Sequence, residues 1–123
     1  MPKELIPIVD ADIKSMMTGN HHYAFGSGSR CNEDGMECKD FRKVCTVKDD
    51  ISRADSANGV AERIAIYGEY LRRNPNFPSL NNANEWHTNE VRGLYILKNS
   101  EWQIVESMHE IPPSNHPACL EWR

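Results

Sequence analysis

The sequence predicts a small single α+β domain spanning residues 1–123, in which one long helix packs on a curled antiparallel sheet that ends in a C-terminal hairpin. Three observations predict this class. The length of 123 residues suits one domain and not two. The segment 55–73 carries apolar residues at helical spacing. Near the C-terminus, two runs rich in β-branched and aromatic residues flank a two-residue turn.

The first 18 residues are predicted to begin extended and to continue as a short helix. Asp10 suits the N-cap position of that helix. Ile13, Met16 and Met17 follow at the spacing of one helical face, and the glycine-asparagine pair after residue 18 favours an end there. Because so short a helix is marginal alone, it requires a packing partner.

Residues 19–40 are predicted to form a long Gly-rich loop, with one short strand near residues 23–25. Four of the seven glycines of the chain fall in this segment. A loop of this length in a compact domain is usually functional or cross-linked. We therefore expect it to face a ligand or a partner.

The long helix is predicted over residues 55–73. Four apolar residues recur there at intervals of four, three and four, which places them on one helical face: Val60, Ile64, Tyr67 and Leu71. Asp55 or Ser56 suits the N-cap. Asn74 precedes a proline and so favours the end of the helix.

The sheet is predicted from three further segments. Residues 41–48 are rich in residues that suit a pleated strand. Residues 91–98 and 101–107 form the expected hairpin around Asn99-Ser100. Residues 108–123 contain three prolines and are expected to form an irregular tail, in which Trp122 either folds back onto the domain or anchors a partner.

Charge and hydropathy patterning exclude two broad classes. The chain has 14 Lys and Arg against 18 Asp and Glu, a net charge of −4, which argues against broad nucleic-acid binding. A membrane span needs about 20 apolar residues in a row, and the runs here are far shorter. The N-terminal residues lack the apolar core of a secretory signal, so a cytoplasmic location is expected if Met1 is the native start.

The four cysteines allow three interpretations. The main one is that all are unbridged, with Cys45 and Cys119 as buried thiols and Cys31 and Cys38 as loop thiols, because a reducing cytosol disfavours disulfides. Disulfides are the second interpretation, and four cysteines allow three pairings. The third is a zinc site, although no C-x₂₋₄-C pair is present; its ligands would be Cys31, Cys38, Cys45 and His22, or the neighbouring His21.

The segment 25–30 (FGSGSR) is the candidate ligand-binding site. Alternating Gly and Ser residues let successive backbone N–H groups form an anion-binding nest, onto which Arg30 adds a guanidinium fork. The candidate ligand-binding residues are His21, His22, Ser27, Gly28, Ser29 and Arg30. The segment is neither a Walker A motif nor a dinucleotide fingerprint, and a flexible turn is the alternative.

A second candidate pair is His87 and Glu90, which would share a helical face as a base and its orienting carboxylate if residues 86–90 were helical. The alternative is a polar loop before the hairpin. No catalytic residue is assigned.

The predicted function is that of a small cytosolic, non-enzymatic binding protein, such as an inhibitor, an adaptor, an immunity-type protein or a ligand-sequestering protein. It would act through the loop and tail surface on a protein partner or on a second copy of itself, with no membrane and no cofactor. One alternative is a small enzyme or receptor for a phosphorylated or nucleotide-like ligand bound at the GSGSR loop. Another is a zinc-stabilised interaction module.

Overall fold

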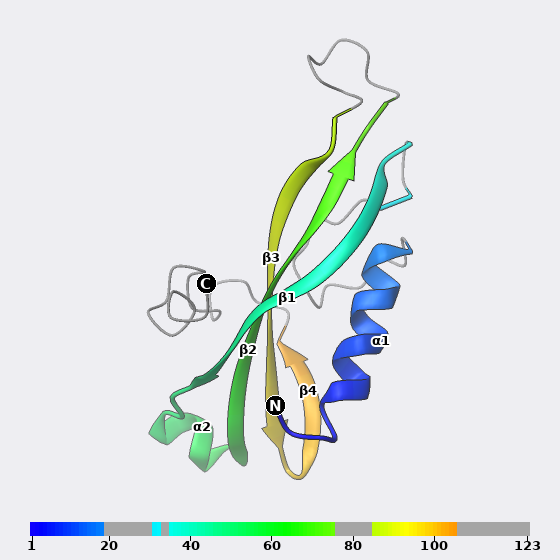
Figure 1. Cartoon of the computed structure of the whole chain (residues 1–123). Helices are drawn as coiled ribbons and strands as arrows, with labels where there is room; N and C mark the ends of the chain where they lie inside the picture. The colour runs from blue at the N-terminus through cyan, green and yellow to red at the C-terminus, as the bar shows by residue number, and fades with distance from the viewer. Residues whose placement is uncertain (19–30, 33–34, 76–84, 106–123) are drawn as a thin grey trace.

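The computed structural model describes residues 1–18, 31–32, 35–75 and 85–105. These residues contain, in chain order, α1 (Ile6–Met17), β1 (Glu37–Asp49), α2 (Arg53–Ala57), β2 (Val60–Arg73), β3 (His87–Lys98) and β4 (Glu101–Val105). The strands form one antiparallel sheet in the order β1-β2-β3-β4, so each pairs with its neighbour in sequence (Figure 1). The predicted antiparallel sheet is confirmed, and no helix among the described residues is long and apolar enough to cross a membrane.

The long helix predicted over residues 55–73 is wrong, because residues 60–73 form β2, which pairs with a strand on each side. Side chains alternate along this strand: Ile64 and Ile66 belong to one apolar cluster, and Ala65 and Tyr67 to another. A strand buried on both faces carries apolar residues without a clean two-residue period. Apolar periodicity alone does not separate such a strand from a helix.

The predicted N-cap, Asp55 or Ser56, is also wrong, because Ser52 is the N-cap of the five-residue helix α2 and Asp55 lies three residues inside it. The hydroxyl of Ser52 accepts a hydrogen bond from the backbone N–H of Asp55 at 3.0 Å, and the Asp55 carboxylate accepts one from the Ser52 N–H at 3.4 Å. Gly59 follows with φ +86°, a left-handed conformation that ends the helix and that favours glycine. The chain then enters β2.

Helix α1 was predicted in the right region, but it begins at Ile6 and not near Asp10. Pro7 lies in its first turn, where a missing N–H removes no intrahelical bond. The helix ends at Met17, and the hydroxyl of Thr18 donates a hydrogen bond to the backbone oxygen of Lys14 at 2.8 Å.

The C-terminal hairpin is confirmed. Asn99 and Ser100 have φ values of 50° and 68°, as a two-residue type I′ turn requires. Strand β1 begins at Glu37, so the last four residues of the predicted loop 19–40 belong to the sheet. Residues 106–107 of the predicted second hairpin strand and the tail 108–123 lie outside the described residues.

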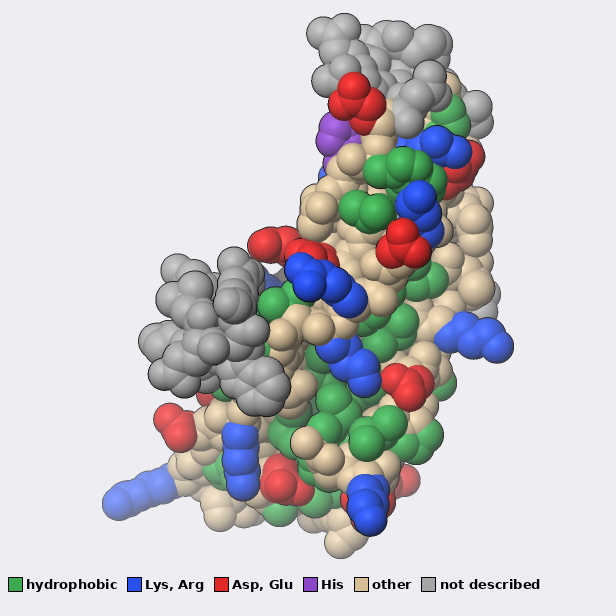
Figure 2. Space-filling view, viewed as in Figure 1, with side chains coloured by type: hydrophobic (Ala, Val, Ile, Leu, Met, Phe, Trp, Pro, Cys, Tyr) green, Lys and Arg blue, Asp and Glu red, His purple; other side chains and the backbone are tan. Residues whose placement is uncertain are grey.

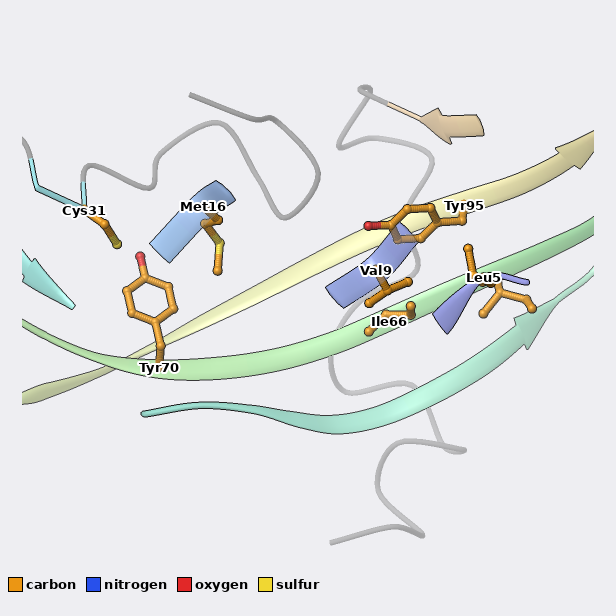
Figure 3. Packing of buried hydrophobic residues seen from close by; sticks show 8 residues of the cluster. Leu5, Val9, Met16, Cys31, Ile66, Tyr70 and Tyr95 are labelled. Carbon is orange, nitrogen blue, oxygen red and sulfur yellow. The ribbon is translucent and has the colours of Figure 1, made fainter. Parts of the chain in front are cut away.

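The sheet has two apolar faces. The helix face packs against α1, and the buried cluster between them consists of Leu5, Val9, Met16, Cys31, Ile64, Ile66, Tyr70 and Tyr95. Figure 3 shows Cys31, Met16 and Tyr70 together at one end of this layer and Leu5, Val9, Ile66 and Tyr95 at the other. The opposite face buries Cys45, Val47, Ala65, Tyr67 and Leu94, with Val105 packed against them.

Candidate functional site

A disulfide joins Cys31 to Cys38, whose Cα atoms are 5.6 Å apart. Cys38 lies near the start of β1, and Cys31 is fully buried in the cluster that contains Met16 and Tyr70. The bond therefore fixes residue 31, where the predicted loop returns to the sheet, on the helix face beside the end of α1 (Figure 3).

The interpretation of Cys31 and Cys38 as unbridged loop thiols is wrong, and Cys45 is disulfide-bonded as well. Zinc binds cysteine as a thiolate, which a disulfide sulfur is not. In this oxidised form Cys31, Cys38 and Cys45 therefore do not supply the zinc ligands that were predicted. Across the described parts of the chain, no group of three His, Cys, Asp or Glu side chains could hold a metal ion.

Cys38 begins a row of residues that crosses three strands. It pairs with Arg72 of β2, and Arg72 pairs with His87 of β3. Directly paired residues point to the same face of a sheet, so Arg72 and His87 lie on the helix face next to the disulfide. Both are exposed. The predicted helical pair of His87 and Glu90 is wrong, because residues three apart in β3 point to opposite faces.

Trp86 directly precedes β3 and lies against two cations. Nζ of Lys39 is 4.2 Å from the centroid of the indole ring, and Cζ of Arg73 is 4.4 Å from it. Nε of Arg73 also donates a hydrogen bond to Oε2 of Glu37 at 2.7 Å. The indole is thus positioned by side chains from both β1 and β2.

These two groups of residues define what we call the ribbon end: Lys39, Arg72, Arg73, Trp86 and His87. Here β1, β2 and β3 extend past the C-terminal end of α1 (Figure 1). Lys39, Arg72, Arg73 and His87 are paired within the sheet, and Trp86 is next to His87. The side chains of the ribbon end therefore extend from hydrogen-bonded strands.

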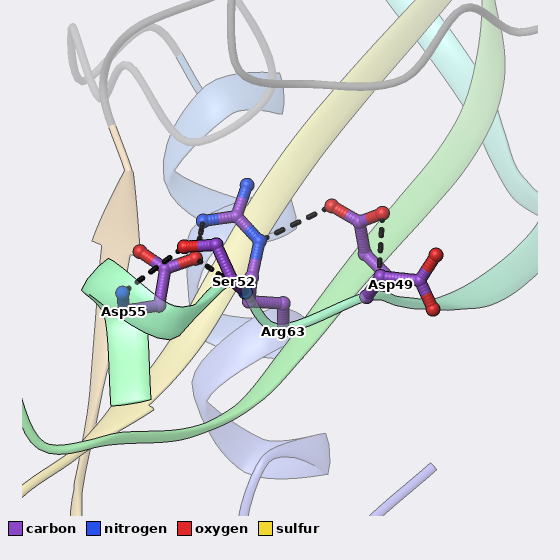
Figure 4. Close-up of polar contacts among 5 residues, drawn as sticks. Asp49, Ser52, Asp55 and Arg63 are labelled. Carbon is purple, nitrogen blue, oxygen red and sulfur yellow. Dashed lines mark hydrogen bonds and ion pairs between the residues drawn. The ribbon is translucent and has the colours of Figure 1, made fainter. Parts of the chain in front are cut away.

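Several charged side chains elsewhere on the sheet form ion pairs that link neighbouring elements. Arg42 of β1 pairs with Glu69 of β2. Arg63 lies between Asp49 at 3.1 Å and Asp55 at 3.5 Å, and so ties β2 to β1 and to α2 (Figure 4). Figure 2 shows positive and negative side chains interspersed along one face of the molecule. This surface is therefore of mixed charge.

Two buried tyrosines have perturbed phenols. Burial and a hydrogen bond to Asp12 raise the pKa of Tyr95 well above its ordinary value. Burial also raises the pKa of Tyr67, and the nearby Arg92 cation partly offsets this effect. Both phenols therefore stay protonated at neutral pH, as structural groups of the core.

All of the predicted ligand-binding residues lie outside the described residues: His21, His22, Ser27, Gly28, Ser29 and Arg30. Arg30 is covalently next to Cys31, whose position the disulfide fixes. Sequence analysis missed the ribbon end because it treated residues 55–73 as helical. The β-branched and aromatic residues of that segment, together with Gly59 and Gly68, were the signal for a strand.

Comparison with known proteins found no match: no family model, no curated protein and no solved structure matches the chain.

Proposed function

We propose that the chain is a non-enzymatic binding protein whose partner surface includes the ribbon end. The observation that carries the proposal is Trp86, held against Lys39 and Arg73 at the end of a rigid sheet. Tryptophan and arginine are enriched among the few residues that dominate the binding free energy of protein interfaces. A side chain already held in place loses little conformational entropy when a partner binds.

Residues 19–30 of the predicted loop 19–40 would extend the partner surface onto the helix face, because Lys39 and Arg73 alternate with Cys38 and Arg72 and so point to the opposite face. Its C-terminal end joins Cys31, which the disulfide ties to the row of Cys38, Arg72 and His87. A partner that contacts Arg72 and His87 is therefore close to the residue to which the loop is joined. An inhibitor, an adaptor and a ligand-sequestering protein are the forms of binding protein that this surface suits.

The disulfides indicate the kind of cellular compartment in which such a protein would work. Cys31, Cys38 and Cys45 are all disulfide-bonded, whereas cytosolic thiols are kept reduced. We therefore propose that the protein works in an oxidising compartment. The cytoplasmic location expected from the N-terminal residues stays a prediction, and the disulfides argue against it.

Affinity capture with matched variants tests the binding proposal. The oxidised full chain is the bait, and Trp86→Ala and Arg73→Ala are compared with Glu101→Ala, which lies in β4 at the other end of the sheet. We expect a partner that the wild type and Glu101→Ala retain and that Trp86→Ala loses. Light scattering of the same variants detects self-association. A partner retained equally by all variants, or neither partner nor oligomer, would contradict the proposal.

A receptor for a phosphorylated ligand is the second candidate. Arg72 and His87 lie beside the disulfide that fixes Cys31, and Cys31 follows directly after the GSGSR segment. These positions would place two further nitrogen donors near an anion-binding nest.

A panel of inorganic phosphate, pyrophosphate and nucleotides in a thermal-shift assay tests this candidate. A ligand at 100 times its Kd adds about 2.7 kcal/mol to the free energy of unfolding. The shift should be reduced in Arg72→Gln and retained in Arg53→Gln, an exposed residue of α2. An absence of any shift across the panel would exclude this candidate without affecting the first.

A further inference from the structure

We infer that the Cys31–Cys38 disulfide is a redox switch for the ribbon end: the bridged form holds Trp86 against Lys39 and Arg73, and reduction releases it. The inference rests on the proposed function, because it assigns a means of regulation to the same surface.

Cys38 lies between the two residues of β1 that contact Arg73 and Trp86. On one side of it, Oε2 of Glu37 accepts a hydrogen bond from Nε of Arg73 at 2.7 Å. On the other side, Nζ of Lys39 is 4.2 Å from the centroid of the Trp86 indole. Cys38 points to the helix face, whereas Glu37 and Lys39 point to the opposite face. The disulfide therefore acts on both contacts through the backbone that these residues share.

A bulge separates the start of β1 from the rest of the strand. Glu37, Cys38 and Lys39 pair with consecutive residues of β2, and the register then shifts before Arg42. Asp40, inside this shift, has a φ of 56°, a left-handed conformation that interrupts a strand. The start of β1 is thus a short paired segment at the end of a strand, and such segments open locally at low free energy. A covalent anchor at Cys38 therefore limits this opening.

The disulfide supplies that anchor from the core. Cys31 is fully buried in the cluster that contains Met16 of α1 and Tyr70 of β2 (Figure 3). A backbone hydrogen bond from the N–H of Asn32 to the oxygen of Met36, 2.9 Å long, crosses the same turn. Asn32 is exposed, however, so this bond does not reach the core. It is the bridge to Cys31 that ties the start of β1 to a cluster built from α1 and the sheet.

Reduction removes this anchor. The start of β1 then opens, so that Lys39 moves away from the Trp86 indole and Glu37 moves away from the Arg73 guanidinium. Trp86 loses a cation that positions it, and Arg73 loses the carboxylate that orients its side chain. The bridged form is therefore the one in which the ribbon end is ordered before a partner arrives, and an ordered surface loses less conformational entropy on binding.

The switch operates by thiol–disulfide exchange with a protein dithiol. Cys38 is half-buried and Cys31 is fully buried, so a thiolate of the reductant attacks the sulfur of Cys38. A mixed disulfide forms, and Cys31 leaves as a thiolate and takes up a proton. The second thiol of the reductant then displaces Cys38, which also takes up a proton. Two electrons and two protons have passed to the chain, and the reductant has become a disulfide.

Nuclear magnetic resonance of Lys39 in the full chain tests the switch. The ring of Trp86 shifts the side-chain signals of Lys39, and Trp86→Ala gives the unshifted reference. We expect this shift in the oxidised wild type, and its loss both in the reduced wild type and in Cys31→Ala/Cys38→Ala measured without reductant. The variant isolates this bond, because reductant also breaks the disulfide of Cys45. A shift that the double variant retains would overturn the inference.

The amide signals of Lys98 and Glu101 are the folding control, because their turn lies at the other end of the sheet. They should stay unchanged in the alanine variant and in Cys31→Val/Cys38→Ala, which refills the buried position 31. Loss of these signals in both variants would also overturn the inference, since the bond would then hold the whole domain and not the ribbon end. No partner enters these measurements. A retained Lys39 shift therefore rejects the switch alone, whereas a partner that binds Trp86→Ala unchanged rejects the binding proposal alone.

Discussion

The hydroxyl of Tyr95 in β3 donates a hydrogen bond to Oδ2 of Asp12 in α1 across 2.7 Å. The Tyr95 side chain is fully buried and Asp12 is half-buried, so competition from water for this bond is reduced. It links the first helix to the third strand, 83 residues later in the chain. The position of α1 on the sheet is thus set by a directional polar contact as well as by apolar packing.

Tyr95→Phe removes this hydrogen bond and keeps the ring. We expect the free energy of unfolding to fall by about 2 kcal/mol, because hydrogen bonds to charged groups contribute about 1.5–3 kcal/mol. Tyr70→Phe is the comparison, since its hydroxyl accepts a bond from the neutral Asn89 amide at 3.0 Å and should cost about 1 kcal/mol. Urea denaturation measures both. Equal losses in the two variants would contradict the special contribution of the charged acceptor.

Stability should decrease at alkaline pH. The pKa values of Tyr67 and Tyr95 are raised above 10.0 in the folded chain. As the pH rises, the unfolded chain loses these protons first, which favours unfolding. The stabilisation is therefore fully present below about pH 10 and is lost above it. Urea denaturation at a series of pH values should show this decrease, with a smaller slope in Tyr95→Phe. The same slope in that variant would be inconsistent with a raised pKa at Tyr95.

Gly68→Ala distinguishes the strand β2 from the helix predicted there. In a helix this change would stabilise the chain by about 1 kcal/mol. In the strand, a Cβ at residue 68 would lie 2.5 Å from the ring of Phe41 and 3.0 Å from the backbone oxygen of Arg42. We therefore expect a loss of about 1–3 kcal/mol from overpacking, measured as a lower midpoint of thermal unfolding. A higher midpoint would contradict the close approach of β1 to β2.

The Cys31–Cys38 disulfide closes a short segment, so its contribution to stability should be moderate. Replacing both cysteines by Ala should lower the free energy of unfolding by about 2–3 kcal/mol, because the unfolded chain regains loop entropy. Denaturation of the oxidised wild type and of the double variant, both measured without reductant, gives the difference. A double variant as stable as the wild type would mean that the packing of Cys31 with Met16 and Tyr70 does not need the bond.

Elements with local signals were predictable from the sequence. The hairpin has a two-residue turn between strands of matching length, and residues 41–48 have strong strand propensity. Strand β2 was mistaken for a helix because it is buried on both faces, so that tertiary contacts, and not a local period, decide its structure. The helix α2 was not predicted as such, because its N-cap is Ser52 and not Asp55 or Ser56, and Gly59 ends it before β2.

The ribbon end was not predictable, because its residues come from three strands. Lys39, Arg73 and Trp86 are far apart in the sequence and meet only when β1, β2 and β3 pair in the observed register. A shift of one residue would turn Lys39 or Arg73 to the other face. The cysteines were predicted to be unbridged because a cytoplasmic location was expected. The spacing of cysteines in a sequence does not determine which of them come close enough to form a disulfide.

The affinity of the captured partner for Trp86→Ala is the measurement that tests the binding proposal most directly. Truncation of a central aromatic anchor typically costs 2 kcal/mol or more, so we expect its Kd to rise by at least about 30-fold. Glu101→Ala, at the other end of the sheet, should bind as the wild type does. Equal Kd values for the wild type and both variants would show that the ribbon end is not the binding surface.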